Sequence, residues 1–371
     1  MTRFCQIFSL LFFLLDSSVL LSQKTENLFL ITLDGLRWQE VFSGADPHLI
    51  SDPEYVNDST LLKSRFWHED PLERRKRLLP FFWNTILPKG QLYGNRFHGN
   101  KMDCSNIFWF SYPGYGEILS GYSDAQNIRS NAKNNNPNKT FLELLHQKRR
   151  YRGSVAAFAS WDVFPYIINE ERSKIPVNAG YRSAMGSNIN KHEKLLNRLQ
   201  NEMPQPWASV RHDVFTHHFA KQYIRRKHPR VVYIAYGETD DYAHDGRYDR
   251  YLSSAWQSSQ FIEDLWSFVQ KDPHYRNKTT FIITTDHGRG DHEKGEWKSH
   301  GSKVEGSSAI WLAVLGPDTP PLGEITKNQQ LWQNQVAATC MKLLGEEFFP
   351  EKEAGPPINE VFIKKRTNKK R

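Results

Sequence analysis

The sequence contains few cysteines, which limits how the fold is held together. Only three of its 371 residues are cysteine, and Cys5 lies in the apolar start of the chain. The other two, Cys104 and Cys340, are too few and too far apart for a disulfide framework. Neither belongs to a C-x-x-C pair, which argues against a cysteine zinc site. They form either one disulfide in an oxidising compartment or two isolated thiols in a core.

Long apolar runs are also missing, with one exception near the start. Arg3 precedes the run Phe4 to Leu15, Asp16 ends it, and the milder stretch Ser17 to Gln23 follows. The run is short for a membrane-spanning helix, and its layout is typical of a secretory signal peptide. We therefore expect a signal peptide over residues 1–23, with an open cleavage position, no stable membrane span in the mature chain, and a periplasmic or secreted location. An uncleaved anchor is the alternative.

Outside the C-terminus, the chain has little net charge. The formal charge is +8 at pH 7, and six basic side chains stand in the last eight residues, which are Lys364, Lys365, Arg366, Lys369, Lys370 and Arg371. Subtracting these six leaves +2 for the rest of the chain. No basic stripe continues into the body, so we expect no nucleic-acid partner. Residues 364–371 are expected to be a solvated, disordered tail.

Short apolar runs, by contrast, recur along the chain and alternate with helical patterns. Each run stops at polar or glycine residues, which is typical of buried strands in a parallel sheet. The expected strands are Leu28–Leu33, Ser154–Ala159, Val231–Tyr236, Phe281–Thr285 and Ala309–Leu315. The expected helices are Thr140–Lys148, Asp213–Arg226, Tyr248–Gln270 and Gln329–Leu344, the last closed by Gly345. This alternation predicts an open α/β sheet with helices on both faces.

In such sheets, ligands bind beyond the carboxyl ends of the strands. Metal-capable side chains stand at or near these ends: Asp34 after the first strand, Asp240 and His244 after the third, Asp286 and His287 after the fourth, and His300 before the fifth. Imidazole and carboxylate together suit zinc and similar divalent ions. The segments 46–76 and 169–206 are predicted to be insertions that lie over the sheet and shape the substrate mouth.

Taken singly, each of these residues has an ordinary structural explanation. An aspartate at a strand end is usually a turn or helix-cap residue. A lone histidine is usually satisfied by a neighbour or exposed. Caps and turns do not explain four such segments that meet at one edge of a sheet. The set therefore predicts a metal site.

Ser111 is the candidate nucleophile. The apolar run Phe108–Phe110 leads into it, and a helix is expected over Tyr115–Leu119. A serine there faces the amino end of the helix, where free amides and the helix dipole favour an anionic oxygen. Metal coordination lowers the pKa of a serine hydroxyl, so no separate general base is required. The alternative is a helix-capping serine without chemistry, which the metal set disfavours.

The order of these motifs resembles that of the alkaline phosphatase superfamily. The motifs are Asp34-Gly35, Ser111-x-Pro113, Asp240-x-x-x-His244, Asp286-His287-Gly288 and His300-Gly301. Among its branches, the chain is most similar to the nucleotide pyrophosphatase/type I phosphodiesterase-like proteins, over about Leu28 to Leu315. The resemblance implies an alkaline-phosphatase-like three-layer α/β sandwich with a mostly parallel central sheet and cap insertions. Its catalytic domain would span residues 24–363.

The resemblance also implies two divalent metal ions, normally zinc, as cofactors. The first would be held by Asp240, His244 and His300, and the second by Asp34, Ser111, Asp286 and His287. Ser111 would attack phosphorus in line and form a covalent phosphoserine, and water on the first ion would then release phosphate.

An asparagine follows the nucleophile in the phosphodiesterase branch, about twenty residues on, and donates to a non-bridging phosphate oxygen. Asn131 stands at that distance, with Asn127 as the second choice. The alternative for Asn131 is a turn residue in the Asn-rich loop Asn131–Asn138.

Three departures from relatives concern the substrate. Sulfatases of the superfamily carry Cys or Ser, x, Pro, x, Arg, whereas Tyr115 stands at the fifth position here, which argues against a sulfatase. Ser111 stands where the phosphodiesterase branch usually has threonine, and Tyr115 and Gly116 replace its usual Asn-His-Tyr surroundings. Monoesterase and diesterase therefore both stay open. The serine also resembles that of the phosphomutases, but these are cytoplasmic and larger.

The sequence thus predicts a secreted two-metal hydrolase that acts on a small-molecule phosphate ester. One alternative is a sulfatase or phosphonate hydrolase that uses the same site. A second is a non-catalytic metal-binding protein of the same fold. The identity of the ion, the natural substrate and the oligomeric state stay open.

Overall fold

The computed structural model describes residues 24–186, 188–291 and 295–362. The predicted signal peptide (1–23) and basic tail (364–371) lie outside the described residues. Among the helices of the described ranges, none combines the length and the apolar composition that a membrane crossing needs.

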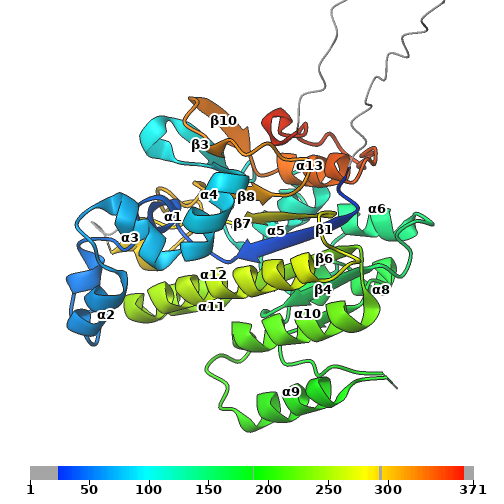
Figure 1. Ribbon diagram of the computed structural model, residues 1–371, viewed down its shortest axis with the longest axis horizontal. Helices are drawn as coiled ribbons and strands as arrows, with labels where there is room; N and C mark the ends of the chain where they lie inside the picture. Colours follow the sequence, from blue (N-terminus) through cyan, green and yellow to red (C-terminus); the bar gives the residue numbers. More distant parts are fainter. Residues whose placement is uncertain (1–23, 187, 292–294, 363–371) are drawn as a thin grey trace, which may run out of the picture.

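A mixed sheet of eight strands forms the centre of the described chain (Figure 1), in the order β5-β4-β6-β1-β7-β8-β2-β9. β8 is antiparallel to its neighbours β7 and β2, and the other pairs are parallel. The strands are β1 (Asn27–Leu33), β2 (Gln91–Tyr93), β4 (Val155–Ala159), β5 (Val177–Ala179), β6 (Val231–Tyr236), β7 (Thr279–Thr284), β8 (Leu312–Leu315) and β9 (Gly323–Glu324). A second, two-stranded parallel sheet joins β3 (Asn100–Asp103) to β10 (Gln329–Trp332). The mostly parallel sheet is therefore confirmed.

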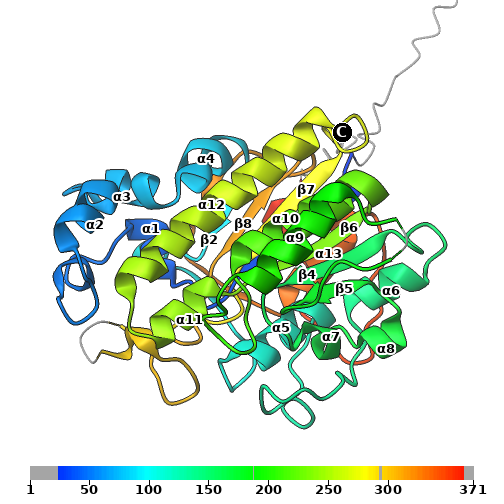
Figure 2. The same ribbon diagram turned by 90° about the horizontal axis from the view of Figure 1, so that it is seen from below.

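Helices cover both faces of the large sheet (Figures 1 and 2). On one face lie α1 (Trp38–Ser43), α3 (Pro71–Leu78), the π-helix η2 (Phe82–Ile86), α10 (Asp213–Lys227) and α12 (Tyr248–Lys271). On the other lie α5 (Ser111–Ser120), α6 (Phe141–Gln147), α7 (Phe164–Ile167) and α13 (Gln335–Leu343). The remaining helical segments are η1 (Leu49–Ser51), α2 (Ser59–Phe66), α4 (Leu87–Lys89), η3 (Arg96–His98), α8 (Glu170–Ser173), α9 (Lys191–Glu202), α11 (Glu238–His244), η4 (Glu296–Lys298) and η5 (Asn359–Val361).

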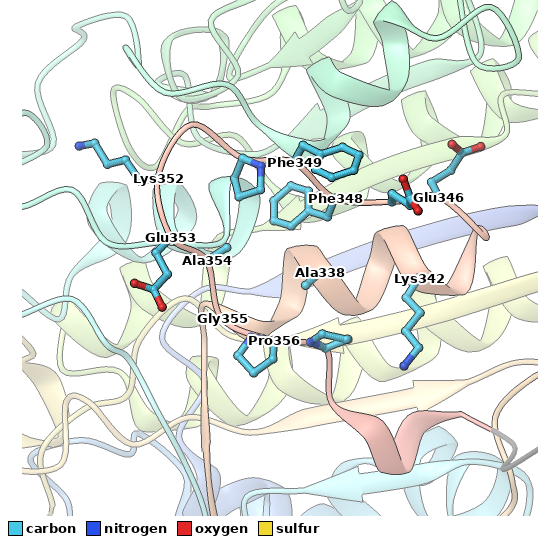
Figure 3. A pocket seen from close by; sticks show the side chains of 13 residues that line it. Ala338, Lys342, Glu346, Phe348, Phe349, Lys352, Glu353, Ala354, Gly355 and Pro356 are labelled. Carbon is cyan, nitrogen blue, oxygen red and sulfur yellow. The ribbon is translucent and has the colours of Figure 1, made fainter.

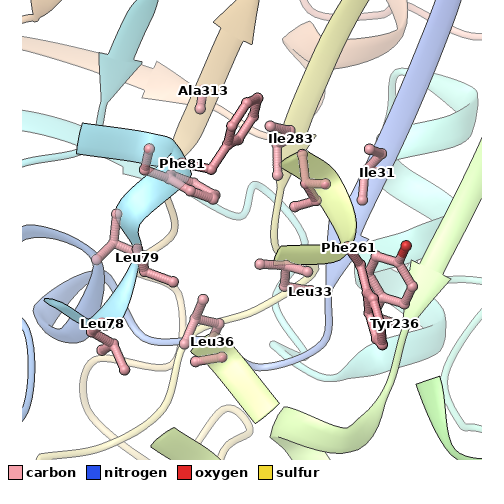
Figure 4. Close-up of a cluster of buried hydrophobic side chains, with 14 of the residues drawn as sticks. Ile31, Leu33, Leu36, Leu78, Leu79, Phe81, Tyr236, Phe261, Ile283 and Ala313 are labelled. Atoms are coloured by element: carbon pink, nitrogen blue, oxygen red, sulfur yellow. The ribbon is translucent and has the colours of Figure 1, made fainter. Parts of the chain in front are cut away.

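Strand β1 shows why a continuous apolar run suits this position. Its side chains alternate between the two faces, as in any strand. Phe29 and Ile31 pack into the core beneath α12, whereas Leu28 and Leu30 pack into the core beneath α5 and α13. Figure 4 shows Ile31 in the first of these cores, close to Phe261 of α12. Both faces of β1 are buried, so every position of the run must be apolar or internally satisfied.

The sequence predicts the strands better than it predicts the last helix. All five expected strands are present, with ends shifted by a few residues. The helix expected over Gln329–Leu344 is wrong in its first part, because Gln329–Trp332 forms β10 and α13 begins only at Gln335. β10 pairs with β3, far away in the sequence, and buries Leu331 between exposed neighbours. A distant pairing partner satisfies these backbone groups, and a local pattern does not reveal it.

The remaining expectations concern the two predicted insertions and the two cysteines. The segment 169–206, predicted to lie over the sheet, also contributes the edge strand β5 to the sheet itself. The segment 46–76 forms η1, α2 and α3, and α3 packs against α1 and α12. Cys104 and Cys340 are two separate buried thiols, so of the two arrangements expected for them the disulfide is not formed.

Candidate metal centre

Three neighbouring strands end in acidic segments. β6, β1 and β7 are adjacent and parallel, so their carboxyl ends lie at one edge of the sheet. Asp34 directly follows β1, and Asp286 comes two residues after β7. Asp240 lies on α11, which begins two residues after β6. The topology thus brings together three carboxylates that are far apart in the sequence.

The metal-capable residues of the sequence gather into two groups. Asp240, His244 and His300 form the first group, and Asp34, Asp286 and His287 form the second. Within each group, one possible ligand atom per residue lies within 4.8 Å of the others. Apart from Ser111, which the resemblance adds to the second set, these are the two sets that the superfamily resemblance implies.

Short distances connect the members of each group. In the first, His244 Nε2 lies 3.0 Å from His300 Nε2 and 3.2 Å from Asp240 Oδ2. In the second, His287 Nε2 lies 3.4 Å from both Asp34 Oδ1 and Asp286 Oδ2. The groups adjoin, since the same His287 nitrogen lies 3.8 Å from Asp240 Oδ1.

Two histidines are oriented by backbone carbonyls behind them. His287 Nδ1 lies 2.9 Å from the Gly288 oxygen, and His300 Nδ1 lies 3.3 Å from the Trp109 oxygen. A carbonyl only accepts, so each Nδ1 carries the proton and each Nε2 presents a lone pair to its group. This is the arrangement in which ligating histidines are held in metal sites. Trp109 has a φ of 53°, a strained value for a bulky residue, and its carbonyl faces His300 in this conformation.

The electrostatics keep His300 neutral. Burial lowers its pKa to about 2. A neutral imidazole is the form that binds a metal ion. Near neutral pH, His300 therefore needs no deprotonation before it can act as a ligand.

The second group has more acceptors than donors. His287 Nε2, Asp34 Oδ1 and Asp286 Oδ2 all present lone pairs to one another. Both of these carboxylate oxygens are buried, and neither has a hydrogen-bond partner among the described residues. A buried carboxylate oxygen without a partner is costly. A cation between the three atoms would remove this cost, so the residues present fit a metal ion.

The pKa values of the three carboxyl groups shift in different directions. Burial raises the pKa of Asp34, and the neighbouring Asp240 raises it further. Burial and then Asp34 likewise raise the pKa of Asp286. Burial opposes the ionisation of Asp240 as well, but Arg289 and His244 outweigh it and hold the pKa of Asp240 well below its usual value. Without further positive charge, the centre therefore favours protonation of Asp34 and Asp286.

Ser111 lies at the second group. It is the first residue of α5, it is buried, and its Oγ is 3.5 Å from His287 Nε2. α5 comes this close to the strand ends because Gly114 has no side chain. A Cβ at Gly114 would lie 2.3 Å from the Asp286 carbonyl oxygen. The hydroxyl therefore lies where the amino end of a helix and the metal-capable side chains meet.

Asn131 lies beside the nucleophile, whereas Asn127 is held elsewhere. The Tyr112 amide, next to Ser111, donates to Asn131 Oδ1 over 3.0 Å. This contact leaves the Asn131 Nδ2 group without a partner among the described residues. Asn127 Nδ2 instead donates to both oxygens of Asp124, at 3.2 and 3.0 Å. Of the two candidates, Asn131 is thus the one whose amide is anchored at the start of α5.

Sequence reasoning missed several residues of the centre. The Tyr115 hydroxyl donates to Asp34 Oδ2 over 2.8 Å. From the sequence, Tyr115 serves only to argue against a sulfatase. Arg289, three residues after Asp286, is buried and donates to Asp240. The Gly35 amide donates to Asp286 Oδ1 over 3.1 Å. Gly35 belongs to the Asp-Gly motif, but the sequence does not reveal this contact, and the only signal for Arg289 is its position after the Asp-His-Gly motif.

A hollow of about 790 Å³ lies elsewhere, between α13 and the segment 346–357 (Figure 3). Figure 3 shows Phe348 and Phe349 on this segment above α13. The described residues that line the hollow include no member of the two groups. It therefore has no part in the arrangement of the metal centre.

Gly35 offers a test of how tightly the centre is packed. It has a φ of +58°, and a Cβ there would lie 2.8 Å from Asp240 Oδ1 and 2.9 Å from Arg289 Nε. Gly153 is a matched control, with a φ of +73° and nothing within 4 Å. We expect Gly153→Ala to lower the free energy of unfolding by about 1–2 kcal/mol through backbone strain alone, and Gly35→Ala to lower it clearly more. Chemical denaturation of both variants measures this, and equal losses would contradict the packing described.

The fold of the chain is similar to solved structures, although its sequence is not. No family model matches the chain, and no curated protein matches its sequence. The wild-type alkaline phosphatase PafA matches with a TM-score of 0.62 and 9% identity, over 91% of this chain and 99% of that chain. The 2-O GAG sulfatase BT1596 has a TM-score of 0.53 at 11% identity, over 91% and 73%. A phosphonate monoester hydrolase from Silicibacter pomeroyi has a TM-score of 0.51 at 12% identity, over 87% and 74%.

These matches extend over most of the chain. Their identities are low, so the likeness concerns the arrangement of the elements and not the substrate. The chain has the fold of the alkaline phosphatase superfamily.

Proposed function

We propose that this protein is a two-metal hydrolase of phosphate esters that acts through a covalent phosphoserine on Ser111. The observation that carries the proposal is a pair of adjoining metal-capable groups, the second of which lies at the hydroxyl of one buried serine. Either group alone has a structural explanation. Both groups beside a helix-terminal hydroxyl form the arrangement that an in-line displacement at phosphorus requires.

In this proposal, Asp240, His244 and His300 hold one divalent ion, and Asp34, Asp286, His287 and Ser111 hold the other. The donors are oxygen and imidazole nitrogen, which suits zinc. The two ions supply positive charge that lowers the pKa of the Ser111 hydroxyl and stabilises the attacking and leaving oxygens.

The residues of the chain carry out the bond changes. The Ser111 hydroxyl loses its proton to solvent, its oxygen forms a bond to phosphorus, and the bond from phosphorus to the leaving oxygen breaks. The leaving oxygen takes up a proton from solvent and departs as the alcohol. A water molecule then displaces the serine oxygen from phosphorus and leaves its proton to solvent. Inorganic phosphate departs from a monoester, or a phosphomonoester departs from a diester, and Ser111 regains its proton.

Asn131 and the start of α5 bind the phosphoryl group. The Asn131 carbonyl oxygen is occupied by the Tyr112 amide, so its Nδ2 group is free to donate to a non-bridging oxygen. The amino end of α5 favours negative charge at the same place. Because this donor is fixed before substrate arrives, it costs little reorganisation in the transition state.

The alternatives use the same site. The neighbours in fold include a sulfatase and a phosphonate monoester hydrolase, so neither class is set aside by the fold. Tyr115 favours phosphate over sulfate in our proposal, because it donates to Asp34 at the position where sulfatases carry an arginine. The N-terminal apolar run supports a secreted or periplasmic location. A non-catalytic metal-binding protein would keep the two groups without needing Ser111.

Ser111→Ala tests the nucleophile. We expect the variant to lose turnover of p-nitrophenyl phosphate and of bis-p-nitrophenyl phosphate, because no other described hydroxyl lies at His287 Nε2. Its metal content should largely survive, since six other residues supply the remaining ligands. Parallel assays with sulfate and phosphonate esters identify the substrate class. Unchanged turnover in Ser111→Ala would refute the mechanism, and a metal-loaded wild type without activity on any ester would favour the binding protein.

Asn131→Ala tests the phosphoryl contact. We expect kcat/KM to fall by about a hundredfold, the usual effect of removing one such donor. Asn127→Ala is the matched control, because it removes an asparagine of the same segment that bonds Asp124 instead. Steady-state kinetics on the preferred ester measures both variants. Equal effects of the two substitutions would show that Asn131 serves the loop and not the substrate.

A further inference from the structure

Arg289 is a buried cation within the metal centre. It follows Asp286, His287 and Gly288 along the chain and is 1% exposed. An arginine taken out of water needs strong hydrogen-bond partners, because burying its charge is otherwise costly. The partners of Arg289 therefore show what it does in the centre.

Its guanidinium group joins two separate segments of the chain. On one side, Nη2 donates to Oδ1 of Asp240 and, over 3.1 Å, to the Asp240 carbonyl oxygen. On the other side, Nη1 donates to the Lys298 carbonyl oxygen over 2.7 Å, with the Trp297 oxygen at 3.5 Å. The first side lies on α11, and the second lies on η4.

These two segments carry the whole first group. Asp240 and His244 lie on α11, and His300 lies two residues beyond Lys298. Arg289 itself directly follows the Asp-His-Gly segment of the second group. One side chain thus connects the two segments whose relative position decides whether the first group closes around an ion, and joins both to the second group's segment.

The contact with Arg289 also gives the two carboxylate oxygens of Asp240 different partners. Oδ1 accepts from Arg289, whereas Oδ2 faces His244 at 3.2 Å. A carboxylate held through one oxygen presents the other in a fixed direction. Partners behind metal ligands act in this way, and their loss typically weakens metal binding by about 10- to 100-fold.

An electrostatic role and a positioning role of Arg289 predict opposite effects of its removal on metal affinity. A guanidinium repels a nearby divalent ion, so by charge alone its removal would strengthen metal binding. If its hydrogen bonds fix Asp240 and the segment before His300, its removal would weaken binding. The guanidinium donates to two carbonyl oxygens and a carboxylate oxygen. This directional set of hydrogen bonds favours a positioning role, because a purely electrostatic role would not require it.

We propose that Arg289 is a positioning residue for the first metal site, which it assembles by holding Asp240 and the segment leading to His300 in one arrangement. This inference rests on the proposed function, because it requires an ion at the first group. The second group has hydrogen bonds of its own from Gly35 and Tyr115, and Arg289 acts on its Asp34 only through charge. Its affinity should therefore depend on Arg289 less than that of the first group.

The test uses the full chain, zinc as the probe, and competition with a chelator to measure the two dissociation constants. Arg289→Met removes the fork and the charge, and Arg289→Lys keeps the charge alone. We expect the first-site Kd to rise about 10- to 100-fold in both, with a clearly smaller change in the second-site Kd. Arg211→Met is the matched control, since Arg211 is equally buried but donates to Thr216 Oγ1 and the Asn178 carbonyl oxygen. It should leave both constants unchanged.

His244→Ala assigns the effect to a site. In that background the first site is disabled, so adding Arg289→Met should change the Kd of the remaining site far less than the single substitution changes the first-site Kd. If Arg289→Met does not fold, Arg289→Lys carries the test, because it keeps a counter-charge for Asp240.

Unchanged first-site affinity in Arg289→Lys, or tighter binding in Arg289→Met, would overturn the inference. A loss of affinity in Arg211→Met equal to that in Arg289→Met would also overturn it, because it would indicate a general effect of losing a buried arginine. A wild-type chain that binds no zinc would overturn the proposed function as well, so the two failures are distinguishable.

Discussion

The mutual repulsion of two buried carboxylates and a third that is partly buried is the constraint on which the centre depends. Asp34, Asp240 and Asp286 meet where β6, β1 and β7 end, and water reaches none of them freely. Neighbouring donors stabilise part of the negative charge: Arg289 donates to Asp240, and the Tyr115 hydroxyl donates to Asp34. Two carboxylate oxygens still have no partner among the described residues. A folded chain that keeps all three carboxylates ionised near neutral pH needs further positive charge, and a metal ion is the simplest source.

The rest of the fold maintains the cluster. The three central strands are buried on both faces, so their register is fixed by two apolar cores and their ends cannot slide apart. Two glycines then let neighbouring segments approach closely. Gly114 brings α5 and its Ser111 against the Asp286 carbonyl, and Gly35 leaves room for the Arg289 side chain. Rigid strands and missing side chains together set the separation of the two groups.

Much of this arrangement can be predicted from the sequence, because it depends on local patterns of apolar and polar residues. A buried parallel strand has a recognisable apolar run, so the sequence alone places Asp34 and Asp286 at strand ends and Ser111 near the amino end of a helix. Arg289 cannot be identified in this way, because its role depends on contacts with two segments that are distant in the sequence or separated by a turn. The same reason explains the missed strand β10, whose partner β3 lies more than two hundred residues earlier. Patterns show what a segment can form, but not which distant segment it meets.

The central claim is that the uncompensated carboxylates hold divalent ions. Elemental analysis of the full chain, purified without chelator, tests it most directly. The account predicts two divalent ions per chain, zinc among them, and a large loss of that metal when Asp34 and Asp286 are both replaced by asparagine. A folded, wild-type chain that contains no metal and takes up none from a zinc-containing buffer would contradict it.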